Sequence, residues 1–102
     1  MTTRAVPARR FLESLGARYT LGAFLRAIRE GEGWSLAEMG KQIGMSRTHL
    51  SDIERGCRAV SPQMAATIAR RLGYAEEQMV ELALQGIVDQ SRLKLTVQVK
   101  AA

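Results

Sequence analysis

Apolar residues recur every three or four positions over most of the chain, and this spacing predicts a series of short amphipathic helices. The clearest apolar face follows Thr20 and consists of Leu21, Phe24, Leu25 and Ile28. The same spacing predicts helices over 36–43 and 46–54, between Pro62 and Gly73, and between Glu76 and Gly86. The pattern therefore predicts an all-α domain of five helices over residues 20–86.

A further short helix is predicted ahead of this domain, in an N-terminal extension over 1–19. Pro7 can open a helix because its missing N–H falls where no helical bond is made. Gly16 would end it, and its apolar face would be Phe11, Leu12 and Leu15. This helix could pack on the domain, on a second subunit, or on neither.

The period changes to two in a segment that we assign to a tail over 87–102. Apolar and polar residues alternate there, as is typical of a half-buried β-strand, and the apolar ones are Leu93, Leu95, Val97 and Val99. The chain offers no second strand, and an unpaired strand leaves backbone groups unsatisfied. We predict pairing with the same strand of a second copy, as an intermolecular ribbon about a two-fold axis. The alternative is a tail that folds back on its own domain, or frays.

The stretch 36–56 joins two predicted helices by a tight turn. Gly44 can take a positive φ where the first helix ends, and Ser46 is suited to cap the second. Leu50 and Ile53 give that second helix a thin buried edge. Its other positions carry hydrogen-bonding side chains, namely Arg47, Thr48, His49, Ser51 and Asp52. Such a face suits the major groove of DNA, where each base pair presents its own donor and acceptor pattern.

Composition favours one folded domain with a polyanionic partner. The chain has 102 residues, of which 46% are hydrophobic, and a net charge of +5. This hydrophobic share favours a folded chain over a disordered one. The charge favours nucleic acid only weakly, because many small proteins are basic. No apolar run approaches the roughly 20 residues of a membrane span, and charged residues interrupt any signal-peptide core, so we expect a cytoplasmic protein.

Catalytic and metal chemistry are not expected. A single cysteine, Cys57, excludes an internal disulfide or a cysteine-cluster zinc site, and a single histidine argues against other metal sites. The sequence has no nucleophile with a matching base and no phosphate-cradling glycine loop, so we expect neither enzyme activity nor a cofactor. Cys57 is most simply a loop residue, since a redox role would require an activated thiolate beside Arg55 and Arg58.

The residues from Leu21 to Tyr74 resemble the Cro/lambda-repressor helix-turn-helix family, also called the XRE family. The motifs that carry the resemblance are Leu25-Arg-Ala-Ile-Arg-Glu30, Gly33-Trp-Ser35, Ile43-Gly-Met-Ser46, Leu50-Ser-Asp-Ile-Glu-Arg-Gly56 and Ile68-Ala-Arg-Arg-Leu-Gly73. The resemblance implies a five-helix, lambda-repressor-like domain whose third helix enters the major groove. In this sequence that recognition helix would run from Ser46 to Glu54.

The resemblance also implies a structural ion pair between Arg29 and Glu54, which would fix the angle of the recognition helix. Two positions depart from the family pattern. Leu36 stands where the family usually has a glutamine that touches a phosphate, and it offers no amide for that contact. Gly40 stands where the family prefers alanine; glycine would permit the same close approach of two helices at a propensity cost of about 1 kcal/mol.

Four residues of the recognition helix are candidates for base contact. The fork of Arg47 can bond O6 and N7 of a guanine, which discriminates by about 1–3 kcal/mol. Thr48 can offer a hydroxyl or a methyl group to thymine. Asp52 could accept from a cytosine amino group, orient a neighbouring arginine, or repel wrong sequences. His49 suits a base edge or a phosphate.

A second group of residues is better suited to the DNA backbone, which positions a protein without reading sequence. Arg55 and Arg58 flank the end of the recognition helix, and two serines of this helix could bind phosphate or act as caps. The full set of phosphate candidates is Ser46, Ser51, Arg55, Arg58 and Lys41.

Three functions are consistent with these predictions. The first is a sequence-specific, homodimeric repressor that binds a pseudo-palindromic operator in double-stranded DNA. The second is an antitoxin that also represses its own gene, with 1–19 and 87–102 binding a small toxin protein. The third is a protein-interaction scaffold on the same fold.

Overall fold

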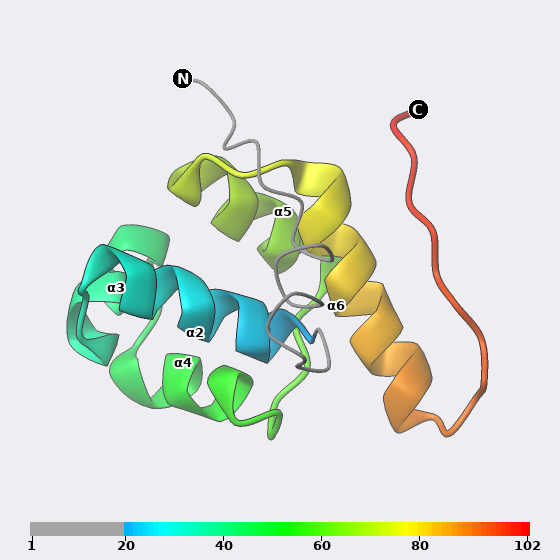
Figure 1. Cartoon of the computed structure of the whole chain (residues 1–102), viewed down its shortest axis with the longest axis horizontal. Helices are drawn as coiled ribbons and strands as arrows, with labels where there is room; N and C mark the ends of the chain where they lie inside the picture. Colours follow the sequence, from blue (N-terminus) through cyan, green and yellow to red (C-terminus); the bar gives the residue numbers. More distant parts are fainter. Residues whose placement is uncertain (1–19) are drawn as a thin grey trace.

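The computed structural model describes residues 20–102, and the helix predicted between Pro7 and Gly16 lies outside them. Within the described part the chain forms five helices, α2 (Leu21–Glu32), α3 (Leu36–Ile43), α4 (Arg47–Glu54), α5 (Pro62–Leu72) and α6 (Glu76–Gln90). The predicted all-α architecture is confirmed. In Figure 1, α2 to α5 gather around a common core, and α6 runs beside them, packed mainly on α5.

Four of the helices begin at a side-chain cap. A threonine or serine hydroxyl accepts a hydrogen bond from the backbone N–H three residues later, and these caps are Thr20, Ser35, Ser46 and Ser61. Each cap satisfies a helix donor that would otherwise lack a partner. Gly44 ends α3 with a φ of 72°, a left-handed conformation that glycine adopts without a Cβ penalty. The turn between α3 and α4 is therefore short and has a fixed direction.

The first turn of α3 contains a reciprocal capping box. The N–H of Glu38 donates to Ser35 Oγ at 3.1 Å, and the N–H of Ser35 donates to Glu38 Oε1 at 2.9 Å. These bonds lower the pKa of Glu38 below its ordinary value, chiefly because the backbone N–H of Ser35 donates to the carboxylate. The charged form of Glu38 is the one that supports the start of α3.

We expect this contribution to disappear in acid. Because the pKa of Glu38 is lowered by folding, its contribution is present above the ordinary carboxyl pKa of about 4.3 and is lost as the pH falls through the lowered value. Thermal melts of the wild type and Glu38→Gln should therefore differ near neutral pH and converge once the pH has fallen below the lowered pKa of Glu38. A difference in melting temperature that stays constant across this range would contradict the capping role.

The core lies between all five helices. Its buried members are Leu21, Phe24, Leu25, Ile28, Met39, Ile43, Leu50, Ile53, Val60, Ala65, Ile68, Ala69, Leu72, Met79, Leu82 and Ala83. Phe24 and Tyr74 add an edge-to-face ring contact with centroids 5.4 Å apart. Leu36 and Met64, which also lie on predicted apolar faces, are partly buried against this set. Because every predicted helical face contributes buried residues, the core forms by the amphipathic packing that the sequence pattern indicates.

The last helix is longer than predicted. α6 passes through Gly86 and ends at Gln90, so residues 87–90 belong to the helix and not to the tail. One glycine lowers helix propensity by only about 1 kcal/mol, and helix propagation is cooperative, so Gly86 alone does not end the helix. Ser91 is the C-cap of the helix, and Arg92 follows with a φ of 59°.

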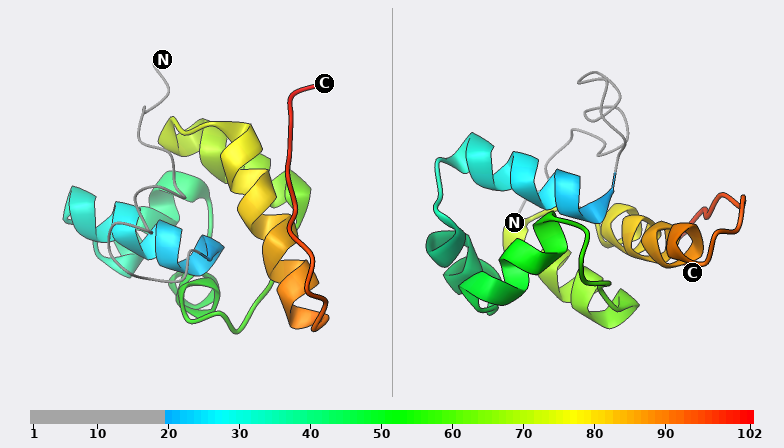
Figure 2. Two further views of the ribbon diagram at one scale, coloured as in Figure 1. Left: turned by 45° about the vertical axis from the view of Figure 1, so that its right-hand side comes forward. Right: turned by 90° about the horizontal axis from the view of Figure 1, so that it is seen from below.

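The predicted C-terminal β-strand is wrong as an element of the single chain, because no strand forms within residues 20–102. The segment 93–99 is extended and runs alongside α6 (Figures 1 and 2). Gln85 Nε2 donates to the Leu95 carbonyl at 2.9 Å, and Gln85 Oε1 accepts from the Val97 N–H at 2.7 Å. Residues 20–102 supply no second strand, so these backbone groups of the segment take side-chain partners on α6.

Candidate nucleic-acid interface

α4 is anchored by one side and presents the opposite side to solvent. Leu50 and Ile53 are buried in the core, and Ser46 caps the helix by accepting from the His49 N–H at 3.1 Å. A helix turns by about 100° per residue, so the outward side is centred on positions 48 and 55. Five candidate residues stand on or beside this outward side, namely Arg47, Thr48, Ser51, Asp52 and Arg55. We call this set the α4 outer face.

Arg47 and Thr48 are exposed at the N-terminal end of the α4 outer face, which is the end that base-reading helices insert most deeply. Ser51 is half-buried one turn later. Arg47 therefore combines an accessible guanidinium with the position that its predicted role requires. Lys41 is exposed in the last turn of α3.

Asp52 lies between two arginines at the C-terminal end of α4. Its Oδ1 accepts from Arg55 Nη2 at 2.7 Å, and its Oδ2 lies 3.7 Å from Arg58 Nη2. The Cys57 N–H donates to the Asp52 carbonyl at 2.8 Å, which turns the loop back and carries Arg58 to the helix. Of the three roles open to Asp52, this geometry favours the orientation of arginines over acceptance from a cytosine.

His49 stands at the edge of the α4 outer face, on the side of α5. With the turn at Gly44 it lines a groove of about 440 Å³ against α5. The polar residues that α5 contributes to this groove are Gln63, Thr67 and Arg71. Sequence reasoning did not single them out, although their spacing of four residues puts them on one helical face.

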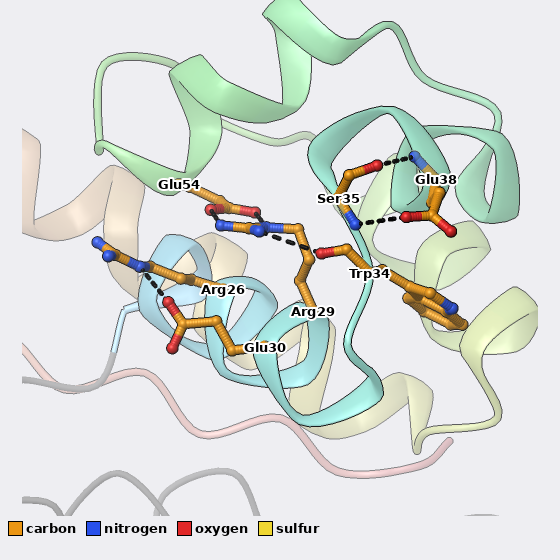
Figure 3. A network of polar contacts seen from close by, with 7 residues as sticks. All are labelled: Arg26, Arg29, Glu30, Trp34, Ser35, Glu38 and Glu54. Carbon is orange, nitrogen blue, oxygen red and sulfur yellow. Dashed lines mark hydrogen bonds and ion pairs between the residues drawn. The ribbon is translucent and has the colours of Figure 1, made fainter.

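The ion pair implied by the resemblance is formed (Figure 3). Arg29 Nε donates to Glu54 Oε2 at 2.8 Å, and Arg29 Nη2 donates to Glu54 Oε1 at 3.0 Å. The third guanidinium nitrogen of Arg29 donates to the Trp34 carbonyl at 3.2 Å. The Glu54 side chain is 6% exposed and the Arg29 side chain 18%. The hydrogen bond to Glu54 is the main reason that the pKa of Arg29 is raised. The pair joins the last turn of α2 to the last turn of α4.

Two glycines allow close backbone contacts, one between α2 and α4 and one between α3 and the turn that follows it. A Cβ at Gly22 of α2 would lie 2.2 Å from the Ile53 carbonyl oxygen of α4. A Cβ at Gly40 of α3 would lie 2.4 Å from the Met45 carbonyl oxygen in the turn. Glycine at position 40 therefore permits a contact with the turn that is closer than an alanine methyl group would allow in this backbone. Sequence reasoning did not assign Gly22 any role, because nothing local to α2 indicates what crosses it.

The described residues contain no cluster of three or more His, Cys, Asp or Glu side chains that could hold a metal ion. None of the helices within 20–102 has the length and hydropathy needed to cross a membrane. Cys57 is exposed in the loop after α4, and its Sγ lies 3.9 Å from the Arg55 carbonyl oxygen.

α4 begins at a side-chain cap, is held by an ion pair to α2, follows a glycine turn and presents a polar outer face. These features together are typical of the class of helix-turn-helix DNA-binding domains. Residues 20–82 match the helix-turn-helix domain family, and the chain belongs to this family. The match covers α2 to α5 and the first half of α6.

Similar proteins are named as transcription regulators. A hypothetical transcription factor of Neisseria meningitidis serogroup B is 32% identical over 78 residues, which cover 76% of this chain and 68% of that protein. An uncharacterized HTH-type transcriptional regulator of Mycobacterium tuberculosis is 37% identical over 57 residues, or 56% of this chain. The chain spans 22% of the length of that mycobacterial relative.

The fold is also similar to a solved structure. The crystal structure of the hypothetical transcription factor NHTF from Neisseria matches with a TM-score of 0.53 and 25% sequence identity. The alignment covers 89% of this chain and 96% of that chain. Family, relatives and fold agree that residues 20–82 form a helix-turn-helix domain of the kind found in proteins named as transcription regulators.

Proposed function

We propose that this protein is a sequence-specific transcriptional repressor of the Cro/lambda-repressor type, which binds a pseudo-palindromic operator as a homodimer. The observation that carries this proposal is the α4 outer face, a set of accessible polar side chains on a helix whose position is fixed by three separate contacts. The N-terminal cap, the Arg29–Glu54 pair and the Gly22 approach all restrain α4. Rigid support of this kind is what a reading element needs.

In this proposal the base contacts come from the first turns of α4. Arg47 and Thr48 read base edges in the DNA major groove. His49, at the side of α4 that faces α5, contacts a base or a phosphate. Asp52 holds Arg55 and Arg58 in place for backbone phosphates, as its contacts at 2.7 Å and 3.7 Å suggest. The net charge of +5 favours association with any DNA, on which the base contacts then impose selectivity.

One copy of α4 contacts only a few base pairs, so a selective site requires two copies. A two-fold dimer would place its recognition helices about one turn of DNA apart, roughly 34 Å. Apolar side chains suited to an interface are exposed near the end of the chain, with Ile87 at 40%, Leu93 at 52% and Leu95 at 61%. These exposed residues support the dimer.

Selection from a randomised duplex library tests the proposal. We expect repeated rounds to enrich two inverted half-sites whose centres lie about 10 base pairs apart. Enrichment of no sequence, although the protein retains DNA at low salt, would reject a specific repressor. Failure to retain DNA even at low salt would favour the protein-interaction scaffold.

Two alanine variants should separate reading from positioning. Arg47→Ala is expected to relax base preference at one position of each half-site by about 1–3 kcal/mol. Arg58→Ala should weaken binding to all sequences alike and reduce the slope of log affinity against log salt by about one per site. Titrations of the selected duplex and its single-base variants measure both effects. Loss of base preference in Arg58→Ala, with Arg47→Ala unchanged, would reverse the assignment.

The exposed apolar residues of the extended segment also suit a second candidate, an antitoxin that represses its own gene. Leu93 and Leu95 would then meet a small toxin protein in place of a second copy. Co-expression with a small neighbouring gene would distinguish the two candidates. Stable co-purification at a fixed ratio supports the antitoxin, and separation of the two proteins rejects it.

A further inference from the structure

The extended segment 93–99 has two backbone edges, because N–H and C=O groups point to alternate sides along an extended chain. One edge faces α6, where the Leu95 carbonyl and the Val97 N–H bond to Gln85, and the Val99 N–H bonds to Glu81 Oε1 at 3.2 Å. The residues whose backbone groups point away from α6 are Lys94, Thr96 and Gln98. We call these three residues the outer edge.

Gln85 acts on this segment as a neighbouring strand would. A side-chain amide carries a donor and an acceptor, like a peptide group. Its Nε2 donates to the Leu95 carbonyl at 2.9 Å while its Oε1 accepts from the Val97 N–H at 2.7 Å. Nε2 also donates to Asp89 Oδ1 at 2.9 Å, which fixes the amide on α6. The segment is therefore held extended before any second strand arrives, with its outer edge directed away from α6.

The order of apolar and polar residues in the segment is the same in both directions from Thr96. Leu95 and Val97 flank this residue, the polar pair Lys94 and Gln98 comes next, and the apolar pair at 93 and 99 follows. An antiparallel partner reads the chain in the opposite direction, so this pattern matches a second copy of itself. A partner of unrelated sequence would not need such symmetry.

We propose that the outer edge pairs with the outer edge of a second copy, in an antiparallel register that sets Thr96 opposite Thr96. This inference rests on the homodimer of the proposed function and gives that dimer its interface. Lys94 then lies opposite Gln98, and both belong to the outer edge, as the direction of their backbone groups requires. Leu95 meets Val97, and the exposed Leu93 meets Val99.

Neighbouring registers that keep the outer edges paired are less favourable. Setting Val97 opposite Val97 brings Lys94 against Lys100, and like charges directly opposite are destabilising. Setting Leu95 opposite Leu95 places Val99 against Ser91 and loses an apolar pair. The register centred on Thr96 keeps all four apolar residues paired. The like charges that it brings together, Arg92 and Lys100, lie outside the segment, and Arg92 belongs to the turn after α6, with a φ of 59°.

Cysteine cross-linking of the full chain tests the interface and its register without DNA. The background is Cys57→Ser, because Cys57 is exposed and would react. Thr96→Cys should form a disulfide-linked dimer in glutathione buffer, since opposed residues in this register have Cα atoms about 5.5 Å apart, within disulfide range. Gln98→Cys is the matched control on the same edge. Its two copies would lie about 14 Å apart, too far to link.

The expected result is efficient linking at position 96, little at 98, and less linking at 96 when Gln85→Leu is added. Equal linking at both positions, or linking at 98 alone, would overturn the register. A monomeric mass by light scattering, or a dimer that never links at 96, would overturn the interface. The proposed DNA binding is judged separately, because a monomer that selects a single half-site would reject this dimer and leave base reading intact.

Discussion

Arg29→Ala is expected to lower the free energy of unfolding by about 3 kcal/mol, because it breaks a buried ion pair on one side only. The variant leaves the Glu54 carboxylate, 6% exposed, without the two hydrogen bonds at 2.8 Å and 3.0 Å that now satisfy it. The Trp34 carbonyl loses its donor as well. In a domain of this size the melting temperature should fall by at least about 10 °C.

The chain supplies a matched control in the same helix. Arg26 forms an ion pair with Glu30 at 2.8 Å, but these side chains are 65% and 58% exposed (Figure 3). Exposed pairs contribute little, so Arg26→Ala should barely change the melting temperature. Arg29→Lys, which keeps the charge but loses the fork, should fall between the two. Equal melting temperatures for Arg29→Ala and Arg26→Ala would show that the buried Arg29–Glu54 pair does not stabilise the fold.

Gly22→Ala is expected to destabilise the domain by about 2 kcal/mol or more, although alanine is the better helix former. The new methyl group would lie 2.2 Å from the Ile53 carbonyl oxygen, which is backbone and cannot rotate away. α2 and α4 would have to separate, and the recognition helix would shift. Chemical denaturation of the variant measures the loss.

Gly31→Ala is the control for this prediction. Gly31 lies in the same helix, and a Cβ there would meet nothing within 4 Å. This variant should stabilise the protein by up to about 1 kcal/mol through helix propensity alone. If both alanine variants were stabilising, the close approach of α2 to α4 would be disproved.

The helices were predictable because their signals are local. Apolar spacing indicated every buried face, and residues such as Ser46 and Gly44 carry their cap and turn geometry within a few positions. The sequence places the end of α6 too early because Gly86 is only a weak helix breaker and the helix continues through it to Gln90. The strand was predicted from its period, which indicates an extended chain but not what pairs with it.

The places of the candidate residues along α4 were predictable from the sequence, whereas the contacts between them were not. The position of Arg47 follows from its distance to the turn, whereas the contacts of Asp52 depend on how the loop returns through Cys57. Gly22 could not be recognised, because its role is set by α4, some 30 residues away in sequence. Contacts between helices distant in sequence depend on tertiary packing, which periodicity alone does not specify.

The central claim is that the α4 outer face reads DNA sequence. Its most direct test is the affinity of the full chain for the selected operator and for a scrambled duplex of equal length and composition, titrated between about 50 and 200 mM salt. We expect the operator to bind at least about 1,000-fold more tightly, with both affinities falling as salt rises. Equal affinities for the two duplexes at every salt concentration would contradict the claim.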